Sequence, residues 1–142
     1  MPPNWLIWAL LSAVFAALTA IFAKLGLKQI DPDFAQLIRT AVVLVAMATL
    51  VAATQKWQAI SSIDGRTWLF LVLSALATGA SWLCYFRALS VGDASRVAPV
   101  DKLSVVLVAI FATIVLGERL SLLAWCGVAL VGLGVVLISI AK

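Results

Sequence analysis

Five long apolar stretches, separated by polar breaks, constrain most strongly how this chain can fold. They lie near residues 5–27, 34–54, 68–89, 94–116 and 122–140. A helix of about 20 apolar residues crosses the roughly 30 Å hydrocarbon core of a bilayer. Because 65% of the 142 residues are hydrophobic and only 11% are charged, a water-soluble fold could not bury this apolar surface. We therefore predict an all-α membrane protein with five transmembrane helices.

Several breaks between the apolar stretches contain residues that stop or start helices. Pro32 follows the first stretch, Gly92 and Asp93 separate the third from the fourth, and Gly117 follows the fourth. Proline cannot continue a preceding helix, glycine often ends one, and aspartate caps the next. Short connections place consecutive helices antiparallel to one another. We therefore expect one compact bundle that forms a single domain over residues 1–142.

Basic residues are distributed unevenly between the two membrane faces. One face would carry Lys56, Arg66 and Arg119, and the other Lys24, Lys28, Arg39, Arg87, Arg96, Lys102 and Lys142. Cytoplasmic loops are richer in Lys and Arg, and Trp favours the membrane interfaces. Five tryptophans lie on or near the basic-poor face: Trp5, Trp8, Trp57, Trp68 and Trp125. For a multi-pass protein of the plasma (inner) membrane, this favours an external N-terminus and a cytoplasmic C-terminus. The bias is small, so dual topology stays open.

The third apolar stretch carries a polar stripe. Ser74, Thr78, Ser81 and Tyr85 recur at i, i+4, i+7 and i+11, with Trp82 beside them, a spacing that places them along one side of a helix. One interpretation is a helix that lines a polar cavity and contacts a solute through hydroxyls and aromatic rings. The other is that the hydroxyls bond carbonyls of their own helix or join neighbouring helices.

The first stretch has a similar stripe, in which Trp8, Ser12 and Phe15 are candidate solute contacts. Aromatic residues at helical spacing more often pack against other helices or lipid, so that alternative also stays open. In the last stretch Ala124, Gly127, Val131 and Gly134 form a small-residue face. Such a face favours close helix packing or self-association.

The fourth stretch begins with a proline and two charged residues. Pro99 leaves a carbonyl one turn earlier without its helical partner, and transporters place such helix breaks around binding sites. Asp101 and Lys102 lie beside this break, and Arg39 in the second stretch is a candidate partner for Asp101. Ionisable groups at membrane depth are costly and often functional. If transport is coupled to protons, Asp101 is the best carboxylate available; the alternatives are snorkelling, a structural ion pair or a simple helix start.

Several classes of function are excluded by what the sequence lacks. The chain contains no histidine, which removes the commonest metal ligand and general base, so we expect no metal and no other cofactor. HExxH and GxSxG motifs and paired intramembrane carboxylates are absent, so we do not expect an enzyme. The basic residues are scattered along the chain, so we expect no nucleic-acid binding.

The stretch YFRALSVGDASRVAPVDKLSVVLVAIFATIVLGERLS, followed by a Gly-rich last span, resembles the EamA-type domain of the drug/metabolite transporter superfamily. The resemblance covers essentially the whole chain, including a Lys-ended first span and an Arg near the start of the second. It implies an exporter or facilitator of amino acids, related metabolites or drugs. It also implies half of a ten-helix transporter built from two inverted five-helix units.

Because this chain provides one such unit, we expect a homodimer in the lipid bilayer, with an antiparallel pair favoured over a parallel one. The small multidrug resistance proteins of the same superfamily depend on a glutamate in their first span. No carboxylate occupies that span here, so their proton coupling cannot be carried over.

These features favour a transporter that moves a small metabolite or drug-like solute by alternating access. The alternative is a non-transporting membrane protein that serves as a subunit or regulator of a larger complex. The sequence does not specify the solute, the direction of transport or a coupling ion.

Overall fold

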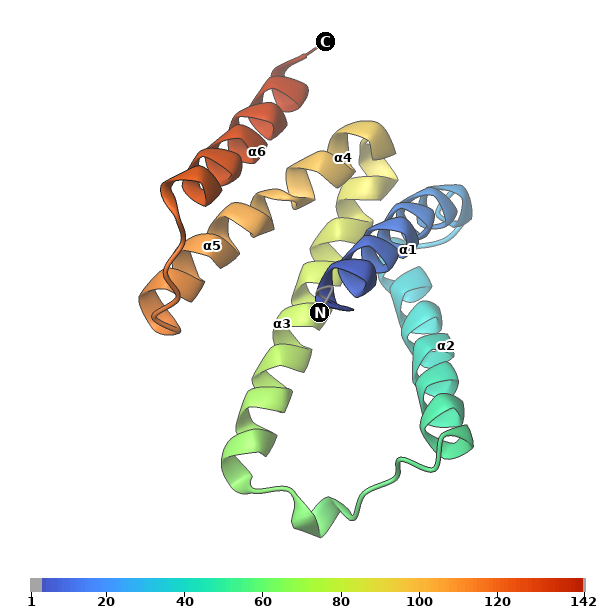
Figure 1. Ribbon diagram of the computed structural model, residues 1–142. Coiled ribbons are helices and arrows are strands. Elements are labelled where there is room, and N and C mark those ends of the chain that lie inside the picture. Colours follow the sequence, from blue (N-terminus) through green and yellow to red (C-terminus); the bar gives the residue numbers. More distant parts are fainter. Residues whose placement is uncertain (1–3, 142) are drawn as a thin grey trace. The chain divides into compact units, whose positions relative to one another are not determined.

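The computed structural model describes residues 4–141, and all of their regular structure is helical (Figure 1). The elements are α1 (Asn4–Gly26), α2 (Pro32–Ala53), the short 3₁₀ helix η1 (Ile60–Ser62), α3 (Gly65–Val91), α4 (Ala94–Asp101), α5 (Leu103–Val115) and α6 (Leu122–Ile140). Five segments are long and apolar enough to cross a membrane, with α4 and α5 together forming the fourth. The predicted all-α membrane fold is therefore confirmed. Residues 1–3 of the predicted domain, and Lys142 from the orientation argument, lie outside the described residues.

The chain divides into two compact units. Unit 1 consists of Met1–Ala20 and Gly92–Lys142, and unit 2 consists of Ile21–Val91. In unit 1, α6 packs against both α4 and α5; in unit 2, α2 packs against α3. The last turn of α1 also belongs to unit 2, where the ammonium of Lys24 donates a hydrogen bond of 2.7 Å to the carbonyl of Leu89 near the end of α3.

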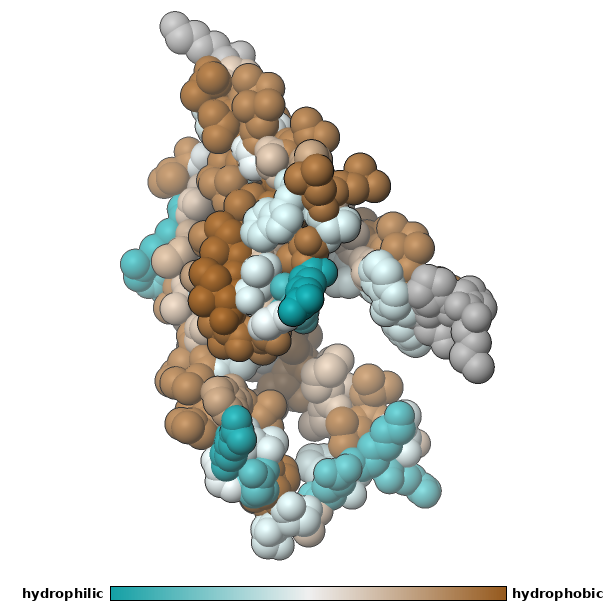
Figure 2. Space-filling view, turned by 60° about the vertical axis from the view of Figure 1, so that its left-hand side comes forward, coloured by the Kyte–Doolittle hydropathy of each residue, from teal (hydrophilic) through white to brown (hydrophobic). Residues whose placement is uncertain are grey.

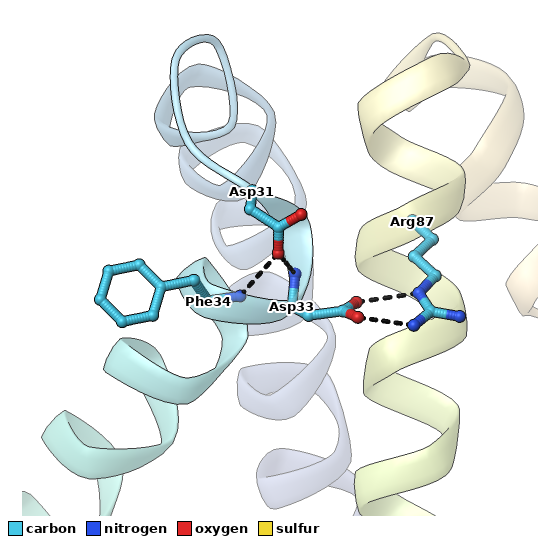
Figure 3. Close-up of polar contacts among 4 residues, drawn as sticks. All are labelled: Asp31, Asp33, Phe34 and Arg87. Carbon is cyan, nitrogen blue, oxygen red and sulfur yellow. Dashed lines mark hydrogen bonds and ion pairs between the residues drawn. The ribbon is translucent and has the colours of Figure 1, made fainter.

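The start of α2 is determined by Asp31 and Pro32. One carboxylate oxygen of Asp31 accepts hydrogen bonds from the backbone N–H groups of Asp33, at 2.9 Å, and Phe34, at 3.1 Å (Figure 3). Pro32 is the first helical residue, a position where its missing N–H has no cost. The helix therefore begins two residues before the predicted boundary at residue 34.

The third span begins three residues before its predicted start at residue 68, because Asp64 caps it. The carboxylate of Asp64 accepts a hydrogen bond of 3.3 Å from the N–H of Thr67. Hydrogen bonding from Thr67 holds the pKa of Asp64 below its ordinary value, since these bonds favour the ionised form.

The fourth span is interrupted at Lys102, between α4 and α5. Pro99 lies inside α4, and the break comes three residues later, where the N–H of Lys102 bonds the carbonyl of Pro99 at 2.9 Å in a tighter, 3₁₀-like turn. The span ends before Gly117, whose φ of 68° is the left-handed conformation that glycine adopts readily. There the N–H of Glu118 reaches back to the carbonyl of Ala112 at 3.1 Å.

Few of the described side chains are buried. Leu89 is fully enclosed, and Phe86 and Gln36 are nearly so, whereas most large apolar side chains of every span remain exposed. Apolar side chains cover most of the face in Figure 2, with hydrophilic ones in small groups. An apolar surface of this extent requires lipid or another protein to cover it. The chain is therefore a multi-pass membrane protein.

Candidate functional site

Unit 2 contains an open cleft of about 390 Å³ between α2 and α3. Its lining residues are Thr40 from α2 and Leu71, Ser74, Ala75, Thr78, Gly79 and Trp82 from α3. Three of the predicted site residues, Ser74, Thr78 and Trp82, are thus brought together along one wall. Thr40 was not among the candidates. The signal that could have found it is a hydroxyl one turn after Gln36 and next to Arg39 in the second span.

The threonine hydroxyls in the cleft donate to their own helices. Thr78 Oγ1 bonds the carbonyl of Ser74, and Thr40 Oγ1 bonds the carbonyl of Gln36, each at 2.8 Å. Thr40 Oγ1 also accepts a hydrogen bond of 3.1 Å from the Gln36 amide. The second interpretation of the hydroxyl stripe therefore applies to Thr78. A hydroxyl that donates to its own helix keeps lone pairs for another partner, and contact of Thr78 with a solute stays a prediction. Within residues 4–141, Ser74 makes no side-chain hydrogen bond.

The guanidinium of Arg39 lies beside this cleft and stacks on aromatic rings of α3. Its Cζ is 4.4 Å from the centroid of the Trp82 ring and 5.4 Å from that of Phe86. Nη1 donates a hydrogen bond of 3.3 Å to Oε1 of the buried Gln36. These contacts hold the positive charge against the aromatic wall, an arrangement in which cation–π attraction partly replaces the lost hydration.

Ser81 and Tyr85 belong to the polar stripe but do not line the cleft. Successive residues of a helix point in directions about 100° apart. On this basis, the side of α3 that lines the cleft is rotated by roughly 60° about the helix axis from the side that carries the polar stripe. Tyr85 instead packs edge-on against Phe86, with ring centroids 6.5 Å apart. Their predicted contact with a solute stays a prediction.

The candidates in the first span, Trp8, Ser12 and Phe15, lie on the part of α1 that belongs to unit 1. All three side chains are exposed. Their role as solute contacts stays a prediction.

Asp101 and Lys102 form an ion pair at the break in the fourth span, with Lys102 Nζ 3.1 Å from Asp101 Oδ2. Both residues belong to unit 1, whereas Arg39 belongs to unit 2. The structure thus gives Asp101 a neighbouring partner of the kind expected for a structural ion pair. The proposed pairing with Arg39 and a role in coupling stay predictions.

A second ion pair joins the start of α2 to the last turns of α3. Two nitrogens of Arg87, Nε and Nη2, donate hydrogen bonds to the two carboxylate oxygens of Asp33 (Figure 3). The distance from Nε to Oδ1 is 2.8 Å. The backbone of Asp33 is held in position next to this ion pair, because its N–H donates a hydrogen bond to the capping carboxylate of Asp31. From the sequence, Arg87 was expected only as a charge on the basic-rich face, and its pairing with Asp33 was not predicted.

A solute-sized, partly polar cleft between two spans of a multi-pass helical protein is the kind of site that membrane transporters use. Residues 3–140 match the profile of the EamA-like transporter family, and the chain belongs to that family. It is 62% identical over 140 residues to a protein of Sinorhizobium sp. named "Uncharacterized transporter in cobO 3'region", and the match covers 99% of each chain. No solved structure matches the chain. The resemblance inferred from the sequence motifs is confirmed, and both the family and the relative's name indicate a transporter.

Proposed function

We propose that the chain carries a small solute across the plasma membrane through the cleft between α2 and α3. The cleft carries this proposal: its volume of about 390 Å³ lies in the range of small-molecule sites, which measure roughly 300–1,000 Å³. Its wall combines Ser74 and Thr78 hydroxyls with apolar and aromatic surface. Such a wall contacts a solute without the full cost of a membrane-embedded charge.

Movement of the solute requires the cleft to open to each side of the membrane in turn. α2 and α3 approach one another at the end held by the Asp33–Arg87 pair and diverge toward η1 (Figure 1). Both side chains of the pair are substantially exposed, at 44% and 65%, and exposed ion pairs stabilise only weakly. The pair would therefore close one end of the cleft in one state and break in the other.

The interrupted fourth span fits the same function, because transporters commonly place discontinuous helices near their sites. The ion pair of Asp101 and Lys102 lies at this interruption. It would change when the helices move between the two openings of the cleft, or when a coupled ion binds.

The functional assembly we propose is a homodimer, in which two five-helix units supply the two halves of an alternating-access transporter. The relative from Sinorhizobium sp. matches over 99% of its own length, so it also contains one such unit. An antiparallel pair needs insertion in both orientations, and the small difference in basic residues between the two faces favours an external N-terminus without preventing the opposite orientation.

The function is tested with purified chain in liposomes and a panel of labelled metabolites. We expect at least one solute to enter faster than it enters protein-free vesicles, with saturable kinetics. Transport is contradicted if no solute moves faster and none shifts the thermal stability of the protein. Co-purification at fixed stoichiometry with an unrelated protein, in the absence of uptake, would favour the alternative of a non-transporting subunit.

A further inference from the structure

The guanidinium of Arg39 is held against aromatic side chains of α3 by stacking on Trp82 and Phe86. Arg39 lies seven residues after Pro32, at the start of α2, and its partner Trp82 lies nine residues before Val91, at the end of α3. At 1.5 Å per residue, these positions are roughly 10 and 14 Å from the helix ends. A snorkelling arginine extends toward the headgroups, whereas this one stacks against Trp82, the deeper of its two aromatic neighbours.

Among the described residues of unit 2, this charge has no carboxylate within ion-pair distance. The two ion pairs of the described residues use other cations, Arg87 with Asp33 and Lys102 with Asp101. Arg39 makes one side-chain hydrogen bond, to the neutral amide of Gln36. An intramembrane charge is costly unless it is paired, so an entering anion would supply the compensation that the described residues of unit 2 do not provide.

Arg39 and the cleft are connected through Trp82. Trp82 lines the cleft, and the guanidinium of Arg39 stacks on its ring. Thr40, which also lines the cleft, directly follows Arg39 in the chain. The described residues that line the cleft include no charged side chain, and Arg39 adjoins the cleft through its contact with Trp82. The apolar wall is provided by residues such as Leu71 and Ala75.

We propose that the solute of this cleft is an organic monoanion, a small carboxylate with an apolar body, whose carboxylate pairs with Arg39. This inference rests on the transport function proposed above and narrows its substrate class. A guanidinium presents two parallel N–H donors that match a carboxylate. One positive charge balances one negative charge, so a dianion would leave a charge uncompensated. An ammonium group finds no acidic partner in the lining, so cations and zwitterions bind more weakly.

The test uses two probes, hydrocinnamate and isocaproate, each compared with its primary amide and with the amino acid of the same skeleton, phenylalanine or leucine. Binding to the purified full chain in detergent is measured from the shift in thermal unfolding midpoint, and transport from uptake into liposomes. We expect the carboxylates to bind about ten- to a hundred-fold more tightly than the amides, since hydrogen bonds to charged groups contribute that much.

The variants separate a charge effect from damage to the fold. We expect Arg39→Gln to abolish the preference for carboxylate over amide, and Arg39→Lys to keep part of it, because lysine keeps the charge but not the planar pair of donors. The matched control is Arg66→Gln. Arg66 also lies over an aromatic ring, with its Cζ 5.9 Å from the centroid of Phe70, but near the other end of α3 and outside the cleft lining. This control should leave the preference unchanged.

Failure of the inference and failure of the proposed function are distinguishable. Equal binding of carboxylate and amide, no binding of either carboxylate, or an unchanged preference in Arg39→Gln overturns the monoanion proposal, while uptake of any neutral or zwitterionic solute leaves transport standing. If no probe and no member of the metabolite panel is taken up, the transport function itself fails.

Discussion

Arg87 in the last turns of α3 engages both carboxylate oxygens of Asp33 in the first turn of α2, so the two helices are tied together at one end of the cleft. Asp31 caps α2 immediately before this point and fixes the backbone from which the Asp33 side chain projects. The sequence places these charges 54 residues apart, and the fold makes them neighbours.

We predict that reversing one charge of the pair lowers transport. Asp33→Arg or Arg87→Asp should reduce the initial uptake rate about two- to five-fold, because the end of the cleft would no longer close and like charges would repel one another. The double exchange, with Arg at 33 and Asp at 87, should recover at least half of the wild-type rate.

Uptake into liposomes reconstituted with equal amounts of protein measures this effect. The control is Glu118→Arg, which reverses an acidic residue that forms no ion pair among residues 4–141. A double exchange that is no better than either single reversal would show that the pair does not close the cleft.

Filling the cleft should stop transport without loss of stability. A Cβ atom at Gly79, which lines the cleft, would meet nothing within 4 Å. Gly79→Leu therefore adds bulk at a position where the first side-chain carbon meets open space, and it also improves helix propensity. We expect uptake to fall by at least about ten-fold at an unchanged or higher unfolding temperature. Ala80→Leu, at the next position and outside the lining, is the matched control, and equal rates in the two variants would exclude the cleft as the solute path.

The small-residue face of α6 provides a test of the homodimer. An added Cβ at Gly127 or Gly134 would meet nothing within 4 Å, whereas one at Gly132 would contact Val106 of α5. We expect Gly127→Leu to weaken self-association about ten-fold, because small residues allow close approach of helices in membranes. Crosslinking and mass photometry in detergent measure the dimer. Ala129→Leu, also exposed but on the opposite side of α6, should leave it intact; the same dimer fraction in both variants would place the interface elsewhere.

The pH dependence of stability should include a contribution from Asp64. Its pKa is lowered in the folded chain by hydrogen bonding from Thr67, so the folded state holds the carboxylate ionised at a lower pH than the unfolded state does. The contribution is therefore fully present above the unfolded pKa and is lost as the pH falls through the folded pKa. Thermal unfolding between about pH 6 and 2 should show a shallower loss of stability for Asp64→Asn than for wild type. Parallel curves would contradict the assignment.

The helices and their order could be predicted from sequence because hydrophobic length and helix-breaking residues are local signals. The family resemblance was likewise visible in motifs such as YFRALS and GERLS. The helix starts that differ from the expected ones by two or three residues lie where capping decides the start of a helix, at Asp31 and Asp64. The fourth span breaks at Lys102 rather than at Pro99, because the tightened turn forms three residues after the proline.

The candidate site was only partly predictable. Periodicity brought Ser74, Thr78 and Trp82 to one side of α3, but it could not show that the lining face is rotated toward Gly79, away from Ser81. That rotation depends on how α2 packs against α3, which no local pattern encodes. For the same reason, the cation–π contact of Arg39 could not be read from the sequence.

The most direct measurement of the central claim, that the solute passes through the cleft between α2 and α3, is the accessibility of Ser74 in the membrane. In a chain with Cys84 and Cys126 replaced by serine, a cysteine at position 74 would be treated with a membrane-impermeant thiol reagent from each side, with and without a transported solute. We expect labelling from both sides and protection by the solute. A cysteine that reacts from neither side, or reacts equally whether or not the solute is present, would contradict a solute path through this cleft.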